Sequence, residues 1–250
     1  MKNSLKNIMK KTAAYLLSGS MILGLLPSAG VAVSAAETAE GNSSGVYLNH
    51  QGELEATEFI QLPVGAVKPE NWLENQMLLM KNGITGLMKE HINYNVSTSE
   101  WLNHTSGDAW EKGPYFARGL TAMAYVLDDD ELLDEALLWV AAVIDSQQEN
   151  GYFGPKSNAD WWARMPALDM IRDFYEGVER KEEADRTEKE KEYFAKVIPF
   201  FEKYFRYQLE KLPSDPLDAM WGAARAGDNI EIVYWLYDRQ YDENAPENTR

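Results

Sequence analysis

The segment 159–177 constrains the fold most, because it has the spacing of a helix and is apolar on nearly every side. Its apolar residues recur along the whole segment: Trp161, Trp162, Met165, Leu168, Ile171 and Phe174. A helix without a clear polar face is covered by protein on both sides. The chain is therefore expected to surround this segment with other secondary-structure elements.

Other segments also have the apolar spacing of helices: 69–90, 114–127, 130–149, 188–211 and 228–239. In 114–127, Phe116, Leu120, Met123 and Leu127 fall on one helical face. A possible short strand near 57–64 is the candidate for β structure. These patterns predict an all-α fold.

Buried and amphipathic segments alternate along the chain, which is the pattern of stacked helical hairpins. This alternation predicts an (α/α)6 toroid, in which an outer ring of helices wraps an inner ring. Six hairpins need more helices than this chain has, so the toroid is expected to be incomplete, with residues 59–250 forming about half of the barrel. A repeat solenoid is the alternative, but the sequence lacks self-similarity at a fixed period.

The first 36 residues have the layout of a secretory signal peptide. Lysines at 2, 6, 10 and 11 precede an apolar stretch, and Pro27 and small residues follow it. Cleavage is expected after Ala35 or Ala36, although an uncleaved anchor is the rival interpretation. Residues 37–58 are expected to form a flexible spacer. The sequence thus predicts a secreted protein without a stable membrane span after cleavage.

The charge balance argues against a nucleic-acid partner. The chain has 24 basic and 40 acidic residues and a net charge of −16, and removing the leader makes it more acidic still. Such a surface repels phosphate backbones. The chain has no cysteine, which excludes disulfides and thiol chemistry within it.

Aromatic residues with carboxylates beside them stand at predicted helix starts. The stretches are GDAWEKGPYFARGL at 107–120, GYFGPKSNADWWARM at 151–165 and RAGDN at 225–229. Carbohydrate sites use aromatic faces to stack on sugar C–H groups, and carboxylates to bind hydroxyls or move protons. The starts of inner helices face one rim of a toroid, so these groups are expected to share one cavity.

This interpretation makes Glu111 and Asp160 candidate catalytic residues. The candidate substrate-binding residues are Trp110, Tyr115, Trp161, Trp162, Arg164, Arg225, Asp228 and Asn229. A purely structural interpretation is open for each of them, with the acids as N-caps, the tryptophans as helix staples or core residues, and Arg164 paired with Asp160. The spacing of His91 and His104 predicts no metal site, and no phosphate loop or GxSxG motif is present.

Together, LPVGAVKPENWLENQM, GDAWEKGPYFARGLTAMAYVLDDDELLDEA, QQENGYFGPKSNADWWARMPAL and GDNIEIVYWLYDR resemble the N-terminal half of the bacterial β-L-arabinofuranosidase family, glycoside hydrolase family 127. The resemblance extends from about residue 60 to 240. It implies an (α/α)6 barrel followed by β-sandwich domains, hydrolysing arabinofuranosides from plant glycans. Characterised members use a cysteine nucleophile within a zinc site in the second half of the barrel. No cofactor is therefore expected in this cysteine-free chain, although a full-length relative would hold zinc.

The sequence hypothesis is a secreted, arabinofuranosidase-like glycoside hydrolase domain that acts on oligo- or polysaccharides when complete. One alternative is another six-hairpin glycosidase, such as an unsaturated-uronyl hydrolase that uses only carboxylates. The other is a non-catalytic glycan-binding protein or a truncated relic. The isolated chain is expected to have little or no activity.

Overall fold

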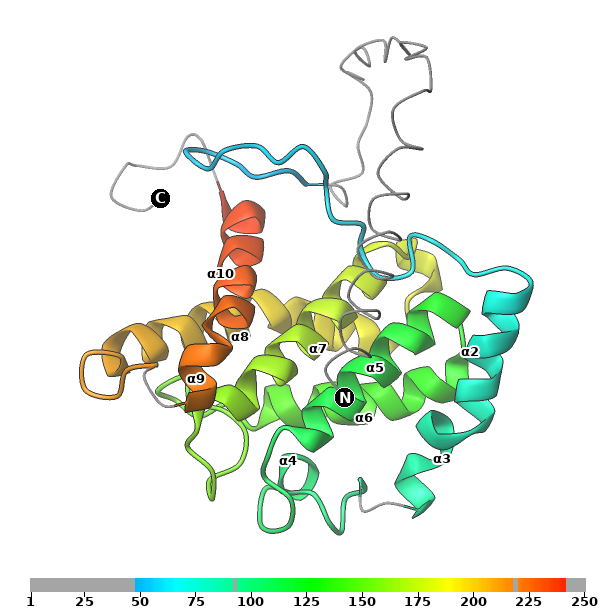
Figure 1. Cartoon of the computed structure of the whole chain (residues 1–250), viewed down its shortest axis with the longest axis horizontal. Coiled ribbons are helices and arrows are strands. Elements are labelled where there is room, and N and C mark those ends of the chain that lie inside the picture. The colour runs from blue at the N-terminus through cyan, green and yellow to red at the C-terminus, as the bar shows by residue number, and fades with distance from the viewer. Residues whose placement is uncertain (1–47, 92–93, 218–219, 242–250) are drawn as a thin grey trace, which may run out of the picture. The chain divides into compact units, whose positions relative to one another are not determined.

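The computed structural model describes residues 48–91, 94–217 and 220–241, and this part of the chain is all-α (Figure 1). Among these residues the only β-type pairing is an isolated bridge between Ser99 and Asp108. The predicted all-α class is therefore confirmed. The helices are α2 (Trp72–Asn82), α3 (Ile84–His91), α4 (Glu100–Asn103), α5 (Lys112–Leu127), α6 (Asp130–Asp145), α7 (Trp161–Glu179), the 3₁₀ turn η1 (Glu183–Asp185), α8 (Glu188–Lys211), α9 (Met220–Ala224) and α10 (Ala226–Gln240).

The long helices pack as two rows. In the first row α5 lies against α7, and α7 lies against α10. In the second row α6 lies against α8, and the hairpins α5–α6 and α7–α8 join the two rows. The short helices α2 and α3 form a separate pair that contacts α5. This arrangement is a stack of helical hairpins in which the starts of first-row helices carry the aromatic motifs.

Helix α7 is the centre of the core, as its sequence predicts. Every residue of this helix except Tyr175 and Glu179 is buried. Its apolar side chains contact both rows, which explains why the segment has no continuous polar face. The buried charged residues of α7 are held in ion pairs and hydrogen bonds that are described below.

Two secondary-structure predictions are wrong, one for a helix and one for a strand. The predicted helix 69–90 is two helices, because the chain breaks at Gly83, whose φ of −107° and ψ of −137° are not helical. The predicted strand near 57–64 is not a strand, because its backbone groups bond to side chains rather than to a neighbouring strand. The Thr57 amide donates to Asn49 Oδ1 at 2.9 Å, and the Val64 amide donates to Glu176 Oε2 at 3.2 Å.

The remaining helices follow the predicted segments within a few residues, and α8 begins and ends where the sequence predicts. Its start carries a capping box in which Thr187 and Glu190 bond to each other's backbone amides. The short helices α4 and α9 were not predicted. The signal peptide, 1–36, and spacer residues 37–47 lie outside the described residues.

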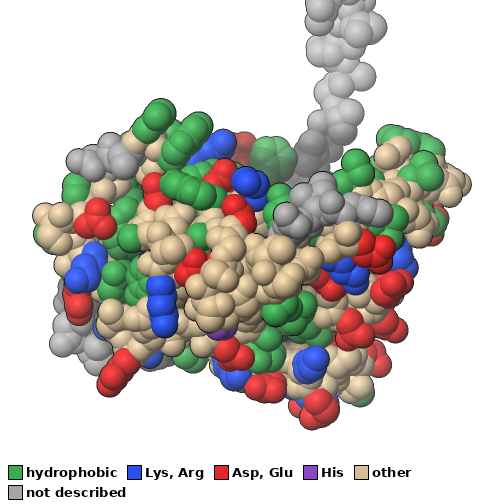
Figure 2. Space-filling model, turned by 90° about the horizontal axis from the view of Figure 1, so that it is seen from below, with side chains coloured by type: hydrophobic (Ala, Val, Ile, Leu, Met, Phe, Trp, Pro, Cys, Tyr) green, Lys and Arg blue, Asp and Glu red, His purple; other side chains and the backbone are tan. Residues whose placement is uncertain are grey.

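Basic side chains are not gathered on the face of the molecule that Figure 2 shows. On the face shown in Figure 2, Lys and Arg side chains lie dispersed among acidic ones, and apolar side chains form several separate patches. Helix α2 also exposes apolar side chains, because it buries none of its residues. Its Trp72 is 76% exposed.

A close approach between α5 and α7 depends on Gly177. A Cβ at Gly177 would lie 2.4 Å from the ring of Tyr125, which is buried and hydrogen-bonded to Glu190. We expect Gly177→Ala to lower the free energy of unfolding by about 1–3 kcal/mol, because this ring has no room to move. Gly119 on α5 is the matched control, since nothing lies within 4 Å of its added Cβ.

Gly119→Ala should raise the free energy of unfolding by up to about 1 kcal/mol, which is the gain in helix propensity. Urea unfolding of both variants and the parent chain measures the two effects. Equal changes in the two variants would contradict the tight contact between the helices.

Candidate functional site

The starts of α5, α7 and α10 bring most of the predicted aromatic and charged residues to one place. Trp110 and Glu111 stand immediately before α5, Trp162 lies in the first turn of α7, and Arg225 is the residue before α10. Because the three helices lie side by side in the first row, their starts can contribute to a common opening.

That opening is a cavity of about 420 Å³, which we call the aromatic cleft. It is lined by Trp110, Glu111, Lys112, Tyr115, Trp162, Trp221 and Arg225. Trp110 and Trp221 are 44% and 49% exposed, whereas Trp162 is only 5% exposed. The cleft therefore has one aromatic ring in its floor and accessible rings at its sides.

The rings and the guanidinium in the cleft contact one another. Tyr115 lies 5.6 Å from Trp162 between ring centroids, at an interplanar angle of 60°. The Cζ atom of Arg225 lies 5.0 Å from the Trp162 ring centroid, in a cation–π contact. Burial raises the pKa of the Tyr115 hydroxyl, and the positive charge of Arg225 opposes that rise. Tyr115 is thus a neutral hydroxyl donor at physiological pH.

Buried hydrogen bonds fix the backbone that carries the cleft aromatics. Trp101 Nε1 donates to the carbonyl of Trp110 at 2.9 Å, and Asn158 Nδ2 donates to the carbonyl of Ala109 at 3.1 Å. Asp160 accepts from the amide of Trp162 at 2.7 Å and caps α7. The loops before α5 and α7 are therefore tied to each other next to the cleft.

Several predicted site residues lie outside the cleft. Arg164 is fully buried, and its guanidinium donates to the carbonyls of residues 153, 155, 158 and 160 and to the hydroxyl of Tyr152. Asn229 is buried and exchanges two hydrogen bonds with Gln208, at 3.1 and 2.9 Å. Trp161 is buried and donates through Nε1 to the carbonyl of Asp215 at 3.1 Å. These three side chains hold the fold together, so a substrate-binding role for them is not supported.

The two predicted acids Asp160 and Asp228 also lie outside the lining of the cleft. Asp160 serves as the N-cap of α7 through its Oδ1. Asp228 lies in the first turn of α10, close enough for its charge to act on Tyr115. Of the two candidate catalytic residues, the structure places only Glu111 among the residues that line the cleft.

Two lining residues were not predicted from the sequence. Trp221 belongs to the five-residue helix α9, and Lys112 begins α5. Trp221 stands four residues before the RAGDN motif, so the same pairing of an aromatic residue with a helix start was present in the sequence. The short helix has too little apolar periodicity to be recognised.

A charged cluster joins α5, α7 and α10 one or more turns below the cleft. Arg118 Nη1 lies 2.8 Å from Asp169, and its Nε lies 3.5 Å from Asp173. Arg172 contacts both of these acids and also reaches Glu231 at 2.6 Å. Burial raises the pKa of Asp169 to about 6, against the opposing charges of Arg172 and Arg118. The cluster holds the three helices of the first row together through charge.

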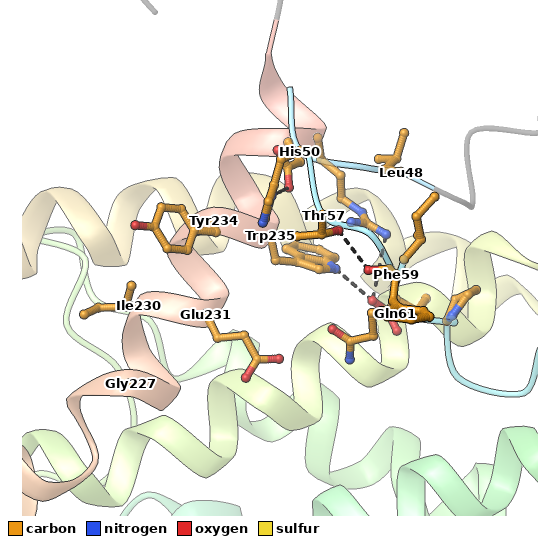
Figure 3. A pocket seen from close by; sticks show the side chains of 15 residues that line it. Leu48, His50, Thr57, Phe59, Gln61, Gly227, Ile230, Glu231, Tyr234 and Trp235 are labelled. Carbon is orange, nitrogen blue, oxygen red and sulfur yellow. Dashed lines mark hydrogen bonds and ion pairs between the residues drawn. The ribbon is translucent and has the colours of Figure 1, made fainter. Parts of the chain in front are cut away.

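A second cavity, of about 450 Å³, lies where residues 48–64 pass over α10 (Figure 3). We call these residues the N-terminal strap. His50 Nδ1 lies 2.8 Å from Asp238, and the Gln51 amide donates to the same carboxylate at 2.9 Å. Glu176 on α7 accepts from Trp235 Nε1 at 2.9 Å and from the strap amide of Val64. The carboxylates in this cavity thus serve largely to fasten the strap.

No family model matches the chain, and no match was found among the curated proteins or the solved structures. Within residues 48–91, 94–217 and 220–241, no helix is both long and apolar enough to cross a bilayer. The same residues contain no cluster of three or more potential His, Cys, Asp or Glu ligands arranged for a metal ion.

Proposed function

We propose that this chain is the substrate-binding part of a secreted glycoside hydrolase built from helical hairpins, and that the aromatic cleft holds an oligo- or polysaccharide. The observation that carries the proposal is the meeting of three helix starts in one cleft, with aromatic rings, a carboxylate and a guanidinium side by side. The resemblance to β-L-arabinofuranosidases supports the same class of ligand.

Each lining group has a role in this proposal. The exposed rings of Trp110 and Trp221 stack on the C–H faces of sugar rings. The Glu111 carboxylate accepts hydrogen bonds from sugar hydroxyls, and Tyr115 and Arg225 donate them. Asn158 ties the loop before α7 to the loop before α5, and Trp101 of α4 holds the Trp110 carbonyl, so the aromatic faces are held in place before a ligand arrives.

The packing of the helices supports the toroidal part of the proposal. Helices α5, α7 and α10 would be inner helices of the ring, and α6 and α8 would be outer helices. The sites of such enzymes are expected where inner helices begin, and the aromatic cleft is at such starts. That further hairpins would close the ring is part of this proposal.

A non-catalytic glycan-binding role is the second candidate, and the composition of the cleft favours it. Hydrolysis by carboxylates uses two of them, one on each side of the scissile bond. Among the residues described as lining the cleft, Glu111 is the only acid. Turnover of aryl arabinofuranosides by the isolated chain would exclude this second role, whereas binding without turnover agrees with both roles, because the isolated chain is expected to have little or no activity.

The proposal predicts saccharide binding that depends on the cleft tryptophans. Titration of the chain with a panel of arabinan-, xylan- and pectin-derived oligosaccharides should change tryptophan fluorescence and release or absorb heat. Trp110→Ala should weaken binding about tenfold or more, because stacking on a sugar contributes on the order of 1–2 kcal/mol. Trp72→Ala is the matched control, since Trp72 is an exposed tryptophan on α2 outside the cleft.

If no saccharide in the panel binds, or if Trp110→Ala and Trp72→Ala weaken binding equally, the proposed function is wrong. Thermal unfolding of both variants shows that the loss comes from the cleft rather than from the fold.

A further inference from the structure

From a guanidinium in the aromatic cleft that has no ion pair among the described residues, we infer that the saccharide is acidic, and that Arg225 binds the carboxylate of a uronic acid residue. This inference rests on the proposed function, because it names the class of sugar that the same cleft takes. Three features of the cleft carry it: the state of Arg225, the placement of the one lining acid and the two helix starts.

Arg225 is available for a ligand anion. Within the described part of the chain, its side chain has no ion pair and no hydrogen bond. Its guanidinium lies over the face of the Trp162 ring. The other arginines of the first row differ in this respect, because Arg118 and Arg172 are held by Asp169 and Asp173. A guanidinium stacked on an indole keeps its planar donor edge free for a carboxylate, which it binds through two parallel hydrogen bonds.

Glu111 lines the same cleft without pairing to Arg225 at ion-pair distance in the structure. The cleft thus presents a free positive charge and a separate hydrogen-bond acceptor. A uronic acid residue offers the complement of both, with a carboxylate for Arg225 and hydroxyl donors for Glu111. A neutral sugar offers hydroxyls alone and would leave the positive charge of Arg225 without an anionic partner.

Lys112 adds to the local positive charge, although the chain as a whole is acidic. It lines the cleft, and its contact with Asp108 is long, at 3.5 Å, with the lysine side chain 63% exposed. A pair of this kind is worth little in water, so the lysine can turn toward a bound anion. The acidic surface elsewhere is screened over distances longer than about 8 Å at physiological salt.

The two helix starts at the cleft favour an anion as well. The N-termini of α6, α7 and α8 are capped by side chains, namely those of Asp129, Asp160 and Thr187. The N-termini of α5 and α10 have no side-chain cap, and their N-cap residues, Glu111 and Arg225, line the cleft. The free amides at a helix N-terminus carry partial positive charge, which adds to that of the guanidinium. Pro114 supplies no amide in α5, and the charge of Asp228 in the first turn of α10 opposes part of this effect.

The test compares each uronic acid oligosaccharide with its own methyl ester, which has the same sugars and linkages without the charge. Isothermal titration of the full chain with oligogalacturonates and glucuronate-bearing xylan oligosaccharides should show the acid binding about tenfold more tightly than the ester. This is the expected effect of one charge-assisted hydrogen-bond pair in an open cleft. The preference should shrink as salt is added.

Arg225→Gln should remove the preference for the acid, so that acid and ester bind to the variant with equal affinity within about twofold. Arg206→Gln is the matched control, because Arg206 is an exposed arginine on α8 outside the cleft, and this variant should keep the preference. Equal binding of acid and ester by the parent chain, or an unchanged preference in Arg225→Gln, overturns the inference and leaves the saccharide cleft standing. Absence of binding by acids, esters and neutral oligosaccharides alike overturns the proposed function itself.

Discussion

Replacing Arg164 by methionine is expected to lower the free energy of unfolding by about 3–5 kcal/mol, because it removes several buried hydrogen bonds from a charged donor, which contribute about 1.5–3 kcal/mol each. The side chain is fully buried, and its three nitrogens bond to the turn that leads into α7. Methionine has a similar length but no donors, so the carbonyl of Phe153 would lose its side-chain donor, and the carbonyls of Pro155 and Asn158 would keep only the Tyr152 hydroxyl. Urea unfolding at neutral pH measures the loss.

Arg164→Lys tests whether the planar fork of donors matters, since lysine keeps the charge but cannot reach several carbonyls at once. We expect it to recover less than half of the loss. Arg206→Met, on the exposed face of α8, is the control and should change the free energy of unfolding by less than about 0.5 kcal/mol. A loss of under 1 kcal/mol in Arg164→Met would show that the turn does not depend on this side chain.

Asp169 should make the fold less stable as the pH rises from about 4 to about 6. Burial raises the pKa of its carboxyl from 3.8 to about 6, while Arg172 and Arg118 oppose the rise and Asp173 adds to it. In this pH window the folded chain binds a proton that the unfolded chain has released. The free energy of unfolding therefore falls with increasing pH, by roughly 3 kcal/mol over the whole window.

Asp169→Asn removes this titration. The free energy of unfolding of the variant, relative to that of the parent chain, should therefore rise by roughly 3 kcal/mol between pH 4 and pH 7. The quantity to compare is the slope of the difference in unfolding free energy with pH, since any cost of the substitution that does not depend on pH leaves that slope unchanged. Asp134→Asn, an exposed acid on α6, should leave the slope unchanged. Parallel pH curves for the parent and Asp169→Asn would contradict the raised pKa.

The helices were largely predictable because their apolar spacing is a local property of the sequence. Helix α7 was expected to be buried on all sides, and the structure confirms it. The break at Gly83 was missed because the apolar spacing continues through it. The region of 57–64 was misjudged because β-prone residues also occur in extended segments whose backbone bonds to side chains.

The cleft was predictable in part. The repeated placement of tryptophan and acid at helix starts correctly brings Trp110, Glu111 and Trp162 together. The same signal also selected Arg164 and Asn229, which do not line the cleft. Arg164 bonds to the loop before α7, and Asn229 bonds to Gln208 on α8. A polar residue near a helix start is equally suited to bind a ligand or to hold a loop. The decision between the two depends on the conformation of the loop before α7 and on the packing of α8 against α10, which local spacing does not specify.

The fastening of the N-terminal strap to α10 has a consequence for how the chain matures. His50 and Asp238 are 188 positions apart, so the strap emerges from the ribosome long before its partner exists. At roughly 5–20 residues per second, that delay is on the order of ten to forty seconds. Until then, the Gln51 amide of the strap lacks the Asp238 carboxylate that it bonds to in the fold. Completion of this clasp is therefore expected to be among the last events of maturation, after the hairpins have assembled.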